Sequence, residues 1–131
     1  NDTAKIMMGT GVYTTIVNMT KDEAKAKWAI NLGDVRESAR VYVNDNFVGC
    51  AWSVPFILDC KDAFKAGKNT LRIEVTNLPA NRISEMDRQG VKWRKFDEIN
   101  VVDINYKKTS YANWEAVKSG LNSSVTLLKL K

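Results

Sequence analysis

Hydrophobic and polar residues alternate along several short stretches of the chain, a pattern typical of β-strands with one buried face. Residues 11–19 read GVYTTIVNM, which alternates and is rich in β-branched residues. Two further alternating stretches flank the residues NDN at 44–46, which suit the tight turn of a β-hairpin. Residues 70–76, TLRIEVT, place every second, hydrophobic residue on one face of a strand. The pattern therefore predicts short strands joined by turns.

The segments between these strands carry weaker signals. Residues 20–27 read TKDEAKAK, in which Thr20 and Glu23 have the spacing of a capping box, so a charged loop or one helical turn is predicted. Residues 61–67, KDAFKAG, resemble a single helical turn closed by a left-handed glycine. The longest stretch predicted to be irregular runs from residue 77 to residue 97.

Two more strands are predicted late in the chain, at residues 99–108 and 124–130. About eight short strands with almost no helix indicate an all-β fold, namely an antiparallel β-sandwich of the jelly-roll type. A parallel sheet would need long crossover helices, and the pattern predicts none. The length of 131 residues suits a single domain that covers residues 1–131.

The hairpin around residues 44–46 is expected to be scaffold. Its alternation predicts four inward side chains, those of Val41, Val43, Val48 and Cys50. It predicts two outward side chains, those of Arg40 and Tyr42. Cys50 and Cys60 form either a disulfide or two small core residues, and the sequence leaves both interpretations open. Two cysteines cannot by themselves make a zinc site.

Histidine is absent from the chain, which removes the commonest general base and the commonest metal ligand. Catalysis by Ser-His or Cys-His pairs is therefore excluded, as are zinc sites that contain histidine. The formal net charge is +5 and the sequence pI is about 9.3, which weakly favours acidic partners. The lysines are scattered between carboxylates over most of the chain, and this pattern is more typical of a solvated surface of mixed sign. No hydrophobic run approaches the roughly 20 residues of a membrane-spanning helix, so no membrane partner is expected.

Three blocks of the sequence resemble one known family. They are NLGDVRESARVYVNDNFVG (residues 31–49), WSVPF (52–56) and LDCKDAFKAGKNTLRIEVTNLPANR (58–82). Together they closely resemble the sugar-binding-type β-sandwich domain of glycoside hydrolase family 2 and of related rhamnosidase-like hydrolases. Residues 7–19 and 119–130 are similar to the first and the closing strand of that domain. The resemblance implies the galactose-binding-like jelly-roll fold.

The resemblance also implies a larger parent protein. The chain begins with Asn1 and not with Met, which predicts that it is processed or cut from a longer protein, and no signal peptide is recognisable at its start. The resemblance implies that it is a C-terminal module of a glycoside hydrolase. In such enzymes a separate catalytic domain performs hydrolysis. The module is therefore expected to be a non-catalytic accessory domain of a secreted, periplasmic or extracellular, polysaccharide-degrading enzyme. Related jelly rolls often carry a structural Ca²⁺, but no EF-hand-like run of carboxylates supports one here, and no other cofactor is expected.

The sequence departs from the family pattern after the last of these blocks, where residues 84–100 read SEMDRQGVKWRKFDEIN. Sugar sites combine aromatic faces, which stack on the pyranose ring, with amide, carboxylate and guanidinium groups that bond its hydroxyls. The loop at residues 81–96 carries all of these groups. Its candidate ligand-binding residues are Asn81, Arg82, Asp87, Arg88, Trp93 and Arg94. A structural role is the alternative, in which Asn81 and Arg82 brace the loop and Trp93 plugs the end of the sandwich.

Two other activities have weaker support in this loop. An acid/base pair could come from Asp87, Asp97, Glu98 and Asp103, but acidic residues beside Arg and Lys more often form surface ion pairs. Basic and aromatic residues also alternate there, yet the flanking acids and the lack of an RNA-binding signature argue against nucleic acid as a partner. A negatively charged sugar accounts for the same basic residues.

The sequence thus predicts one of two functions. The first is a carbohydrate-binding module that contacts an acidic plant or host polysaccharide through residues 81–96. The second is a structural module that buttresses the catalytic domain of the same chain and has no ligand of its own.

Overall fold

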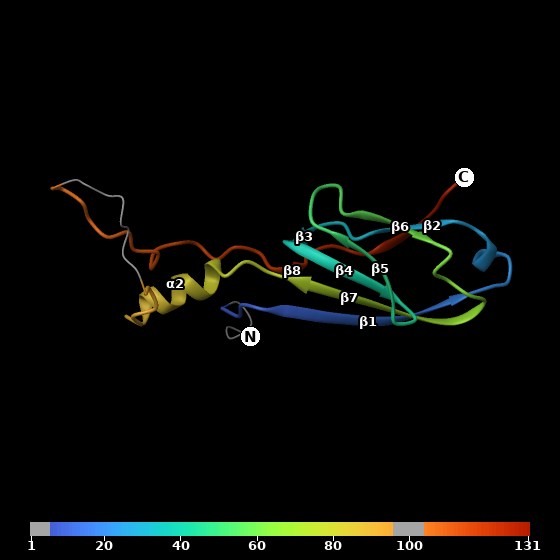
Figure 1. Ribbon diagram of the computed structural model, residues 1–131, viewed down its shortest axis with the longest axis horizontal. Helices are drawn as coiled ribbons and strands as arrows, with labels where there is room; N and C mark the ends of the chain where they lie inside the picture. Colours follow the sequence, from blue (N-terminus) through green and yellow to red (C-terminus); the bar gives the residue numbers. More distant parts are fainter. Residues whose placement is uncertain (1–5, 96–103) are drawn as a thin grey trace. The chain divides into compact units, whose positions relative to one another are not determined.

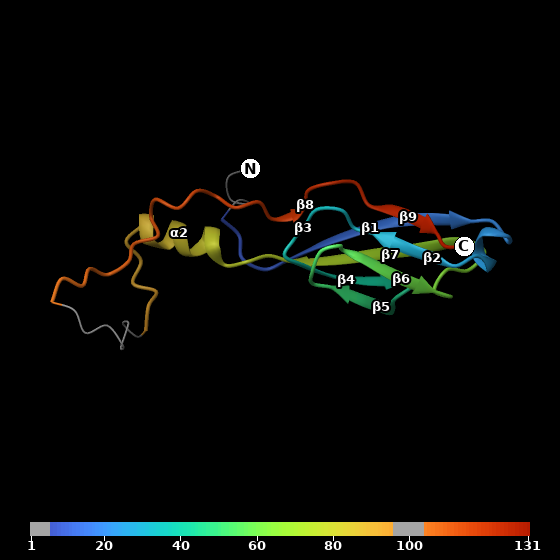
Figure 2. The same ribbon diagram turned by 90° about the horizontal axis from the view of Figure 1, so that it is seen from above.

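The computed structural model describes residues 6–95 and 104–131, and most of its regular structure is antiparallel β-sheet (Figures 1 and 2). The chain divides into two compact units. The first, here called the sandwich unit, comprises Gly9–Leu78 and Lys118–Lys131. The second, here called the helix unit, comprises Asn1–Met8 and Pro79–Val117. No helix in the described part of the chain has the length and apolar character needed to cross a membrane.

Two sheets form the body of the sandwich unit. The four-stranded sheet has the order β1 (Thr10–Met19), β7 (Gly67–Thr76), β4 (Ser38–Val43), β5 (Asn46–Ala51). The three-stranded sheet has the order β6 (Ile57–Lys61), β2 (Trp28–Asn31), β9 (Thr126–Lys129). A short pair joins β3 (Val35–Arg36) to β8 (Gly120–Leu121), and a 3-10 turn, η1, spans Glu23–Lys25. The predicted all-β antiparallel sandwich is confirmed.

The core lies between the two sheets, because hydrophobic residues from both are buried together. The four-stranded sheet contributes the inner residues of β4 and β7, and the three-stranded sheet contributes Ile30 of β2. Burial of such side chains supplies the main favourable term in folding. The fully or almost fully buried residues include Ile30, Leu32, Val35, Val41, Val43, Leu71, Ile73 and Val75. The alternation in residues 70–76 therefore predicted the inner face of β7 correctly.

The hairpin of β4 and β5 follows its prediction except at Cys50. Val41 is buried, Arg40 is exposed and Val48 packs against the core, as expected. Cys50, however, is exposed, and Ala51 is buried in its place. The pairing register between β4 and β5 shifts by one residue after Val41, which makes a β-bulge. A bulge reverses the alternation of the residues that follow it, so the inward assignment of Cys50 was wrong.

The two cysteines are both free thiols, so no disulfide links them. Cys60 is a core residue, as one of the two interpretations proposed, and burial raises the pKa of its thiol to about 11. Cys60 is therefore a protonated, apolar side chain at neutral pH.

Residues 77–97 contain a helix, α2 (Ala80–Arg88), where an irregular stretch was predicted. The helix starts after Pro79, whose carbonyl accepts a hydrogen bond from the N–H of Ile83 at 2.9 Å. It ends before Gly90, which adopts a left-handed φ of 66° while the Val91 N–H bonds the Met86 carbonyl at 2.9 Å. This is the geometry of a Schellman-type C-cap. The turn residues Asn, Pro and Gly mark the ends of this helix, and the prediction mistook them for a continuous loop.

Two further predicted segments do not have the predicted structure in their described residues. Residues 61–67 form a turn and contain no helix. In the strand predicted at residues 99–108, residues 99–103 lie outside the described part, and residues 104–108 form a turn and coil. The capping box of Thr20 and Glu23 is present, since each residue bonds the other's backbone N–H, at 2.7 and 3.2 Å.

Asn69, at the start of β7, explains why residues 61–67 are not helical. Its side chain is fully buried. The amide nitrogen donates to the carbonyls of Lys65 (2.7 Å), Gly67 (3.1 Å) and Val17 (3.4 Å). The amide oxygen accepts from the Lys65 N–H (3.0 Å) and from the side chain of Asn44 (2.8 Å). One buried side chain thus satisfies backbone groups that a helix would have satisfied internally.

We predict that Asn69→Asp lowers the free energy of unfolding by about 3 kcal/mol, because the carboxylate cannot donate to these carbonyls and is itself buried. The measurement is urea unfolding followed by circular dichroism. The matched control is Asn18→Asp, the same change at an exposed position of β1, which should alter stability by less than about 0.5 kcal/mol. Equal losses for the two variants would show that the Asn69 network is not needed for stability.

Candidate functional site

The helix unit holds an irregular segment, residues 104–117, against α2 by means of side-chain hydrogen bonds. The buried Asn81 accepts from the Val117 N–H at 2.8 Å and donates to the Val117 carbonyl at 2.9 Å. The guanidinium of Arg88 donates to the carbonyls of Ala112 (2.8 Å) and Trp114 (3.1 Å). Two of the predicted ligand-binding residues, Asn81 and Arg88, therefore have a bracing role.

Asp87 on α2 fastens the middle of the same segment. One carboxylate oxygen accepts from the indole N–H of Trp93 at 2.5 Å, and the other accepts from the backbone N–H of Tyr111 at 2.7 Å. The hydrogen bond from the Tyr111 N–H, then that from Trp93, lowers the pKa of Asp87 below the usual value of an aspartate. The nearby charges of Arg94 and Lys108 lower this pKa further. Asp87 is thus ionised at neutral pH, and both of its oxygens already accept hydrogen bonds.

Three aromatic rings and one guanidinium group lie beside Asp87. The ring centroids of Trp93 and Tyr111 are 6.2 Å apart, and those of Tyr111 and Trp114 are 4.4 Å apart. The guanidinium carbon of Arg94 lies 5.0 Å from the ring centroids of both Trp93 and Tyr111, and its group donates to the Thr109 carbonyl. These contacts fix the orientation of the indole and of the guanidinium group.

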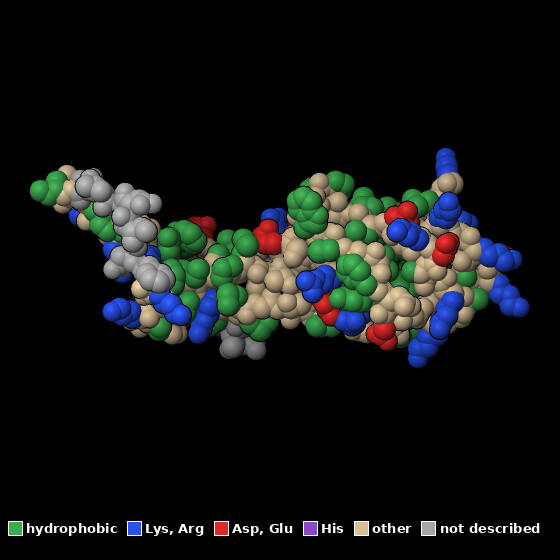
Figure 3. Space-filling model, in the orientation of Figure 1, with side chains coloured by type: hydrophobic (Ala, Val, Ile, Leu, Met, Phe, Trp, Pro, Cys, Tyr) green, Lys and Arg blue, Asp and Glu red, His purple; other side chains and the backbone are tan. Residues whose placement is uncertain are grey.

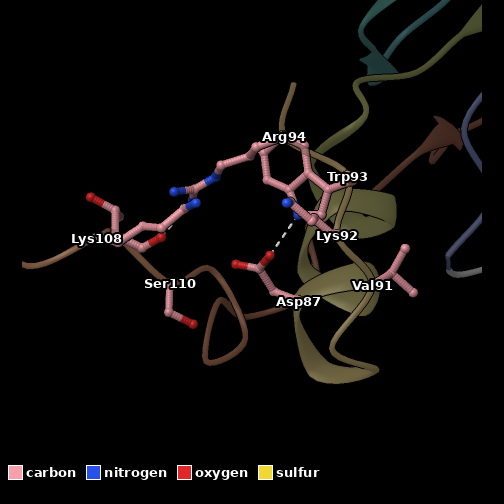
Figure 4. A pocket seen from close by; sticks show the side chains of 8 residues that line it. Asp87, Val91, Lys92, Trp93, Arg94, Lys108 and Ser110 are labelled. Atoms are coloured by element: carbon pink, nitrogen blue, oxygen red, sulfur yellow. Dashed lines mark hydrogen bonds between the residues drawn. The ribbon is translucent and has the colours of Figure 1, made fainter. Parts of the chain in front are cut away.

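A pocket of about 290 Å³ is lined by Asp87, Trp93 and Arg94 together with neighbouring residues (Figure 4). In Figure 4, Asp87 lies beside the indole of Trp93, and Arg94 reaches across toward the segment that carries Lys108 and Ser110. Figure 3 shows Lys and Arg side chains on the visible face of the helix unit, next to hydrophobic ones. The lining residues are Asp87, Val91, Lys92, Trp93, Arg94, Lys108, Thr109 and Ser110.

The charge of this pocket is positive. Lys92, Arg94 and Lys108 supply three cations, and Asp87 is the one carboxylate among its described lining residues. Because both carboxylate oxygens of Asp87 accept hydrogen bonds from Trp93 and Tyr111, its negative charge is stabilised within the protein, and the lining as a whole remains net positive. Such a pocket suits a small ligand that is negatively charged and has an apolar face.

The structure separates the six predicted ligand-binding residues. Asn81 and Arg88 bind the backbone of the 104–117 segment. Asp87, Trp93 and Arg94 come together at the pocket, whereas Arg82 is exposed on α2 and does not line it. Trp93 belongs to the helix unit, where its indole N–H donates to Asp87.

Sequence reasoning missed Lys108 and Tyr111 as part of the site. Tyr111 is 24 residues from Asp87, and the two residues are joined by the hydrogen bond from the backbone N–H of Tyr111. No local spacing in the sequence could have indicated that contact.

Other chemistries receive no support from the described residues. Asp97, Glu98 and Asp103, which were candidates for an acid/base pair, lie outside the described part of the chain, as does Phe96 at the end of the predicted loop. Within residues 6–95 and 104–131 there is no group of three or more Cys, Asp or Glu side chains that could hold a metal ion.

Comparison with known proteins gives consistent matches over almost the whole chain. The family model described as "Glycosyl hydrolase 2 galactose-binding domain-like" matches residues 2–120. A provisionally named beta-glucuronidase of Formosa agariphila is 29% identical over an alignment of 145 residues, which covers 97% of this chain and 12% of that protein. The rhamnosidase of Novosphingobium sp. PP1Y is 28% identical, with a TM-score of 0.73 over 97% of this chain and 11% of its own.

A second similar structure supports the fold alone. It is the beta-glucuronidase of Bifidobacterium dentium in complex with coumarin-3-O-glucuronide, which is 23% identical with a TM-score of 0.50. The match covers 55% of this chain and 12% of that enzyme. The chain therefore spans only about an eighth of the length of these three proteins.

We predict that the indole N–H signal of Trp93 in an NMR spectrum shifts as the pH falls through the lowered pKa of Asp87. The ionised carboxylate stabilises the folded helix unit above the pKa of an unfolded aspartate, and this stabilisation is lost as the pH falls through the lower folded pKa. Asp87→Asn should abolish the shift, whereas Asp62→Asn, an exposed site in the sandwich unit, should leave it in place. A shift that persists in Asp87→Asn would mean that another group titrates beside Trp93.

Proposed function

Because the chain belongs to the glycosyl hydrolase 2 galactose-binding-domain-like family, we propose that it is a non-catalytic, carbohydrate-binding-type module of a glycoside hydrolase. The family resemblance and the galactose-binding-like sandwich that the sequence predicted are both confirmed. The ligand in this proposal is an acidic sugar of a plant or host polysaccharide, held in the pocket beside Trp93. The observation that carries the proposal is the combination of three cations, an aromatic face and a carboxylate that is already occupied.

The residues of the pocket have distinct roles in this proposal. The face of Trp93 stacks on the C–H-rich face of a pyranose ring, and its N–H is used to fix the ring on Asp87. Arg94 has five N–H donors and uses one for Thr109, so others are left for a ligand carboxylate. Lys92 and Lys108 add positive charge at the rim.

One similar protein fits an acidic sugar. The relative from Formosa agariphila is provisionally named a beta-glucuronidase, and a glucuronide carries one carboxylate on its pyranose ring. Hydrolysis itself would belong to another part of the parent enzyme, because the pocket offers one described carboxylate and that carboxylate has a lowered pKa. The parent enzyme would act in the periplasm or outside the cell.

The position of the module in its own parent chain stays a prediction. The matched domain is of the N-terminal type among glycoside hydrolases, whereas the sequence predicted a C-terminal module. The boundaries of a single domain at residues 1–131 also stay a prediction.

A structural module without a ligand is the second candidate function. Exposed hydrophobic side chains favour it, since 76% of the surface of Trp52 and 82% of that of Val54 is accessible. Trp114 in the helix unit is also half exposed. Large hydrophobic side chains of this kind suit contact with another domain of the same chain.

We predict that the protein binds oligosaccharides of glucuronate or galacturonate in a calorimetric titration, and that binding weakens as salt is added. Arg94→Ala should weaken the affinity about tenfold, because a charge-assisted hydrogen bond to the sugar is lost. Trp93→Ala should weaken it several-fold through the loss of one stacking contact of about 1 kcal/mol.

Arg82→Ala is the matched control, since it removes the same charge from an exposed position of α2 outside the pocket. Its affinity should equal that of the unchanged protein. Heat with neutral but not acidic oligosaccharides would contradict the acidic ligand. No heat with any sugar at millimolar concentration would support the structural module instead.

A further inference from the structure

β1 lies at the edge of the four-stranded sheet, and one side of its backbone pairs with β7 (Figure 1). All ten of its residues, TGVYTTIVNM, pair with β7 in one continuous register. The strand contains no charged residue and no proline. No other described strand pairs with its second side. An edge of this length and regularity exposes a row of backbone groups that can pair with another strand.

The other described edges of the sandwich carry the usual protection against such pairing. β5 pairs with β4 through a bulge. β6 carries charged side chains at Asp59 and Lys61, and its pairing with β2 is irregular. β9 has only four residues, one of which is Lys129. Charges, bulges and short length are the features by which natural edge strands avoid association, and β1 has none of them.

β1 also exposes hydrophobic side chains on both of its faces. On the outer face, 60% of the surface of Val12 and 44% of that of Ile16 is accessible. On the inner face, Tyr13 is 41% exposed. The inner face is open because the opposite sheet has only three strands and ends at β9.

A second observation concerns the space above the inner face of β1. A cavity of about 380 Å³ lies there, within the sandwich unit, and none of its lining residues is charged. Thr15 and Val17 of β1 line it, together with hydrophobic residues of β7, β8 and β9. In Figure 2, β1 and β9 lie toward the same edge of the sandwich unit, and they belong to opposite sheets. The cavity therefore continues the uncovered surface of β1 into the interior.

We propose that β1 is an interaction surface that pairs with β1 of a second copy of this chain. Antiparallel pairing about a twofold axis at Thr14 places Val12 of one copy opposite Ile16 of the other on the outer face, twice per dimer. Because the strand is uncharged, this self-pairing brings no like charges together. The two four-stranded sheets then form one continuous sheet.

The same register also closes the cavity. Opposite residues in an antiparallel pair lie on the same face, so Tyr13 of the second copy lies next to Thr15 on the inner face. Thr15 lines the cavity, and the incoming ring covers that part of its lining. This register thus covers exposed hydrophobic surface on both faces of β1. The inference is independent of the proposed sugar site, since it uses no residue of the helix unit.

Sedimentation equilibrium over a wide range of protein concentration tests the proposal. The unchanged protein should shift with concentration from 14.8 kDa to twice that mass. Ile16→Lys should remain at the monomer mass, because a lysine would then lie opposite Val12 at both of the pairs that form the outer face of the contact. Ile57→Lys is the matched control, with an isoleucine of β6 that is 41% exposed, and it should still dimerise. Urea unfolding of both variants verifies that they are folded.

Cross-linking tests the register independently. In a Cys50→Ser background, which removes the exposed thiol, Thr14→Cys should form an intermolecular disulfide on oxidation, because the two copies of residue 14 lie opposite each other. Thr15→Cys should not, since residue 15 lies opposite residue 13. A monomer at every concentration would overturn the proposal, as would dimers that persist in Ile16→Lys. Cross-linking through residue 15 and not residue 14 would overturn the register.

Discussion

The buried amide of Asn69 is the interaction on which one end of the sandwich depends. It bonds backbone groups of the 65–67 turn and of β1, and it meets the side chain of Asn44 in the hairpin turn. None of these segments could leave its polar backbone groups buried without partners. A single side chain with two donors and one acceptor oxygen therefore replaces regular secondary structure where the chain turns into β7.

In the helix unit, other side chains provide hydrogen-bond partners for the backbone of an irregular segment. No described strand pairs with this segment at 104–117, and Asn81, Asp87 and Arg88 of α2 bind its backbone at successive points. This bracing decides the chemistry of the pocket. The carboxylate of Asp87 is fully used within the protein, whereas Lys92, Arg94 and Lys108 keep the charge of the pocket lining positive. Because Asp87 is used to bind the 104–117 segment, the positive charge of the other lining residues makes the pocket favourable for anions.

The sequence predicted those features that depend on near neighbours in the chain. Alternation located the inner face of β7, and the capping box at Thr20 was recognisable from spacing alone. Cys50 was misplaced because a bulge arises from the pairing of two strands and has no signature in either one. Sequence distance also explains why only part of the site was predicted. Asp87 and Trp93 are six residues apart and fell in one candidate loop, whereas Tyr111 is 24 residues from Asp87.

The environment of Asp87 also bears on the choice between binding and hydrolysis. A glycoside hydrolase needs one carboxylic acid that stays protonated near neutral pH, with a second carboxylate nearby. Burial in an apolar pocket raises a carboxyl pKa, whereas hydrogen bonds from N–H groups lower it. Asp87 has the second kind of environment, and its lowered pKa favours the ionised form at neutral pH. Its position is that of a structural residue which orients Trp93, and an oriented indole is what a sugar-binding site requires.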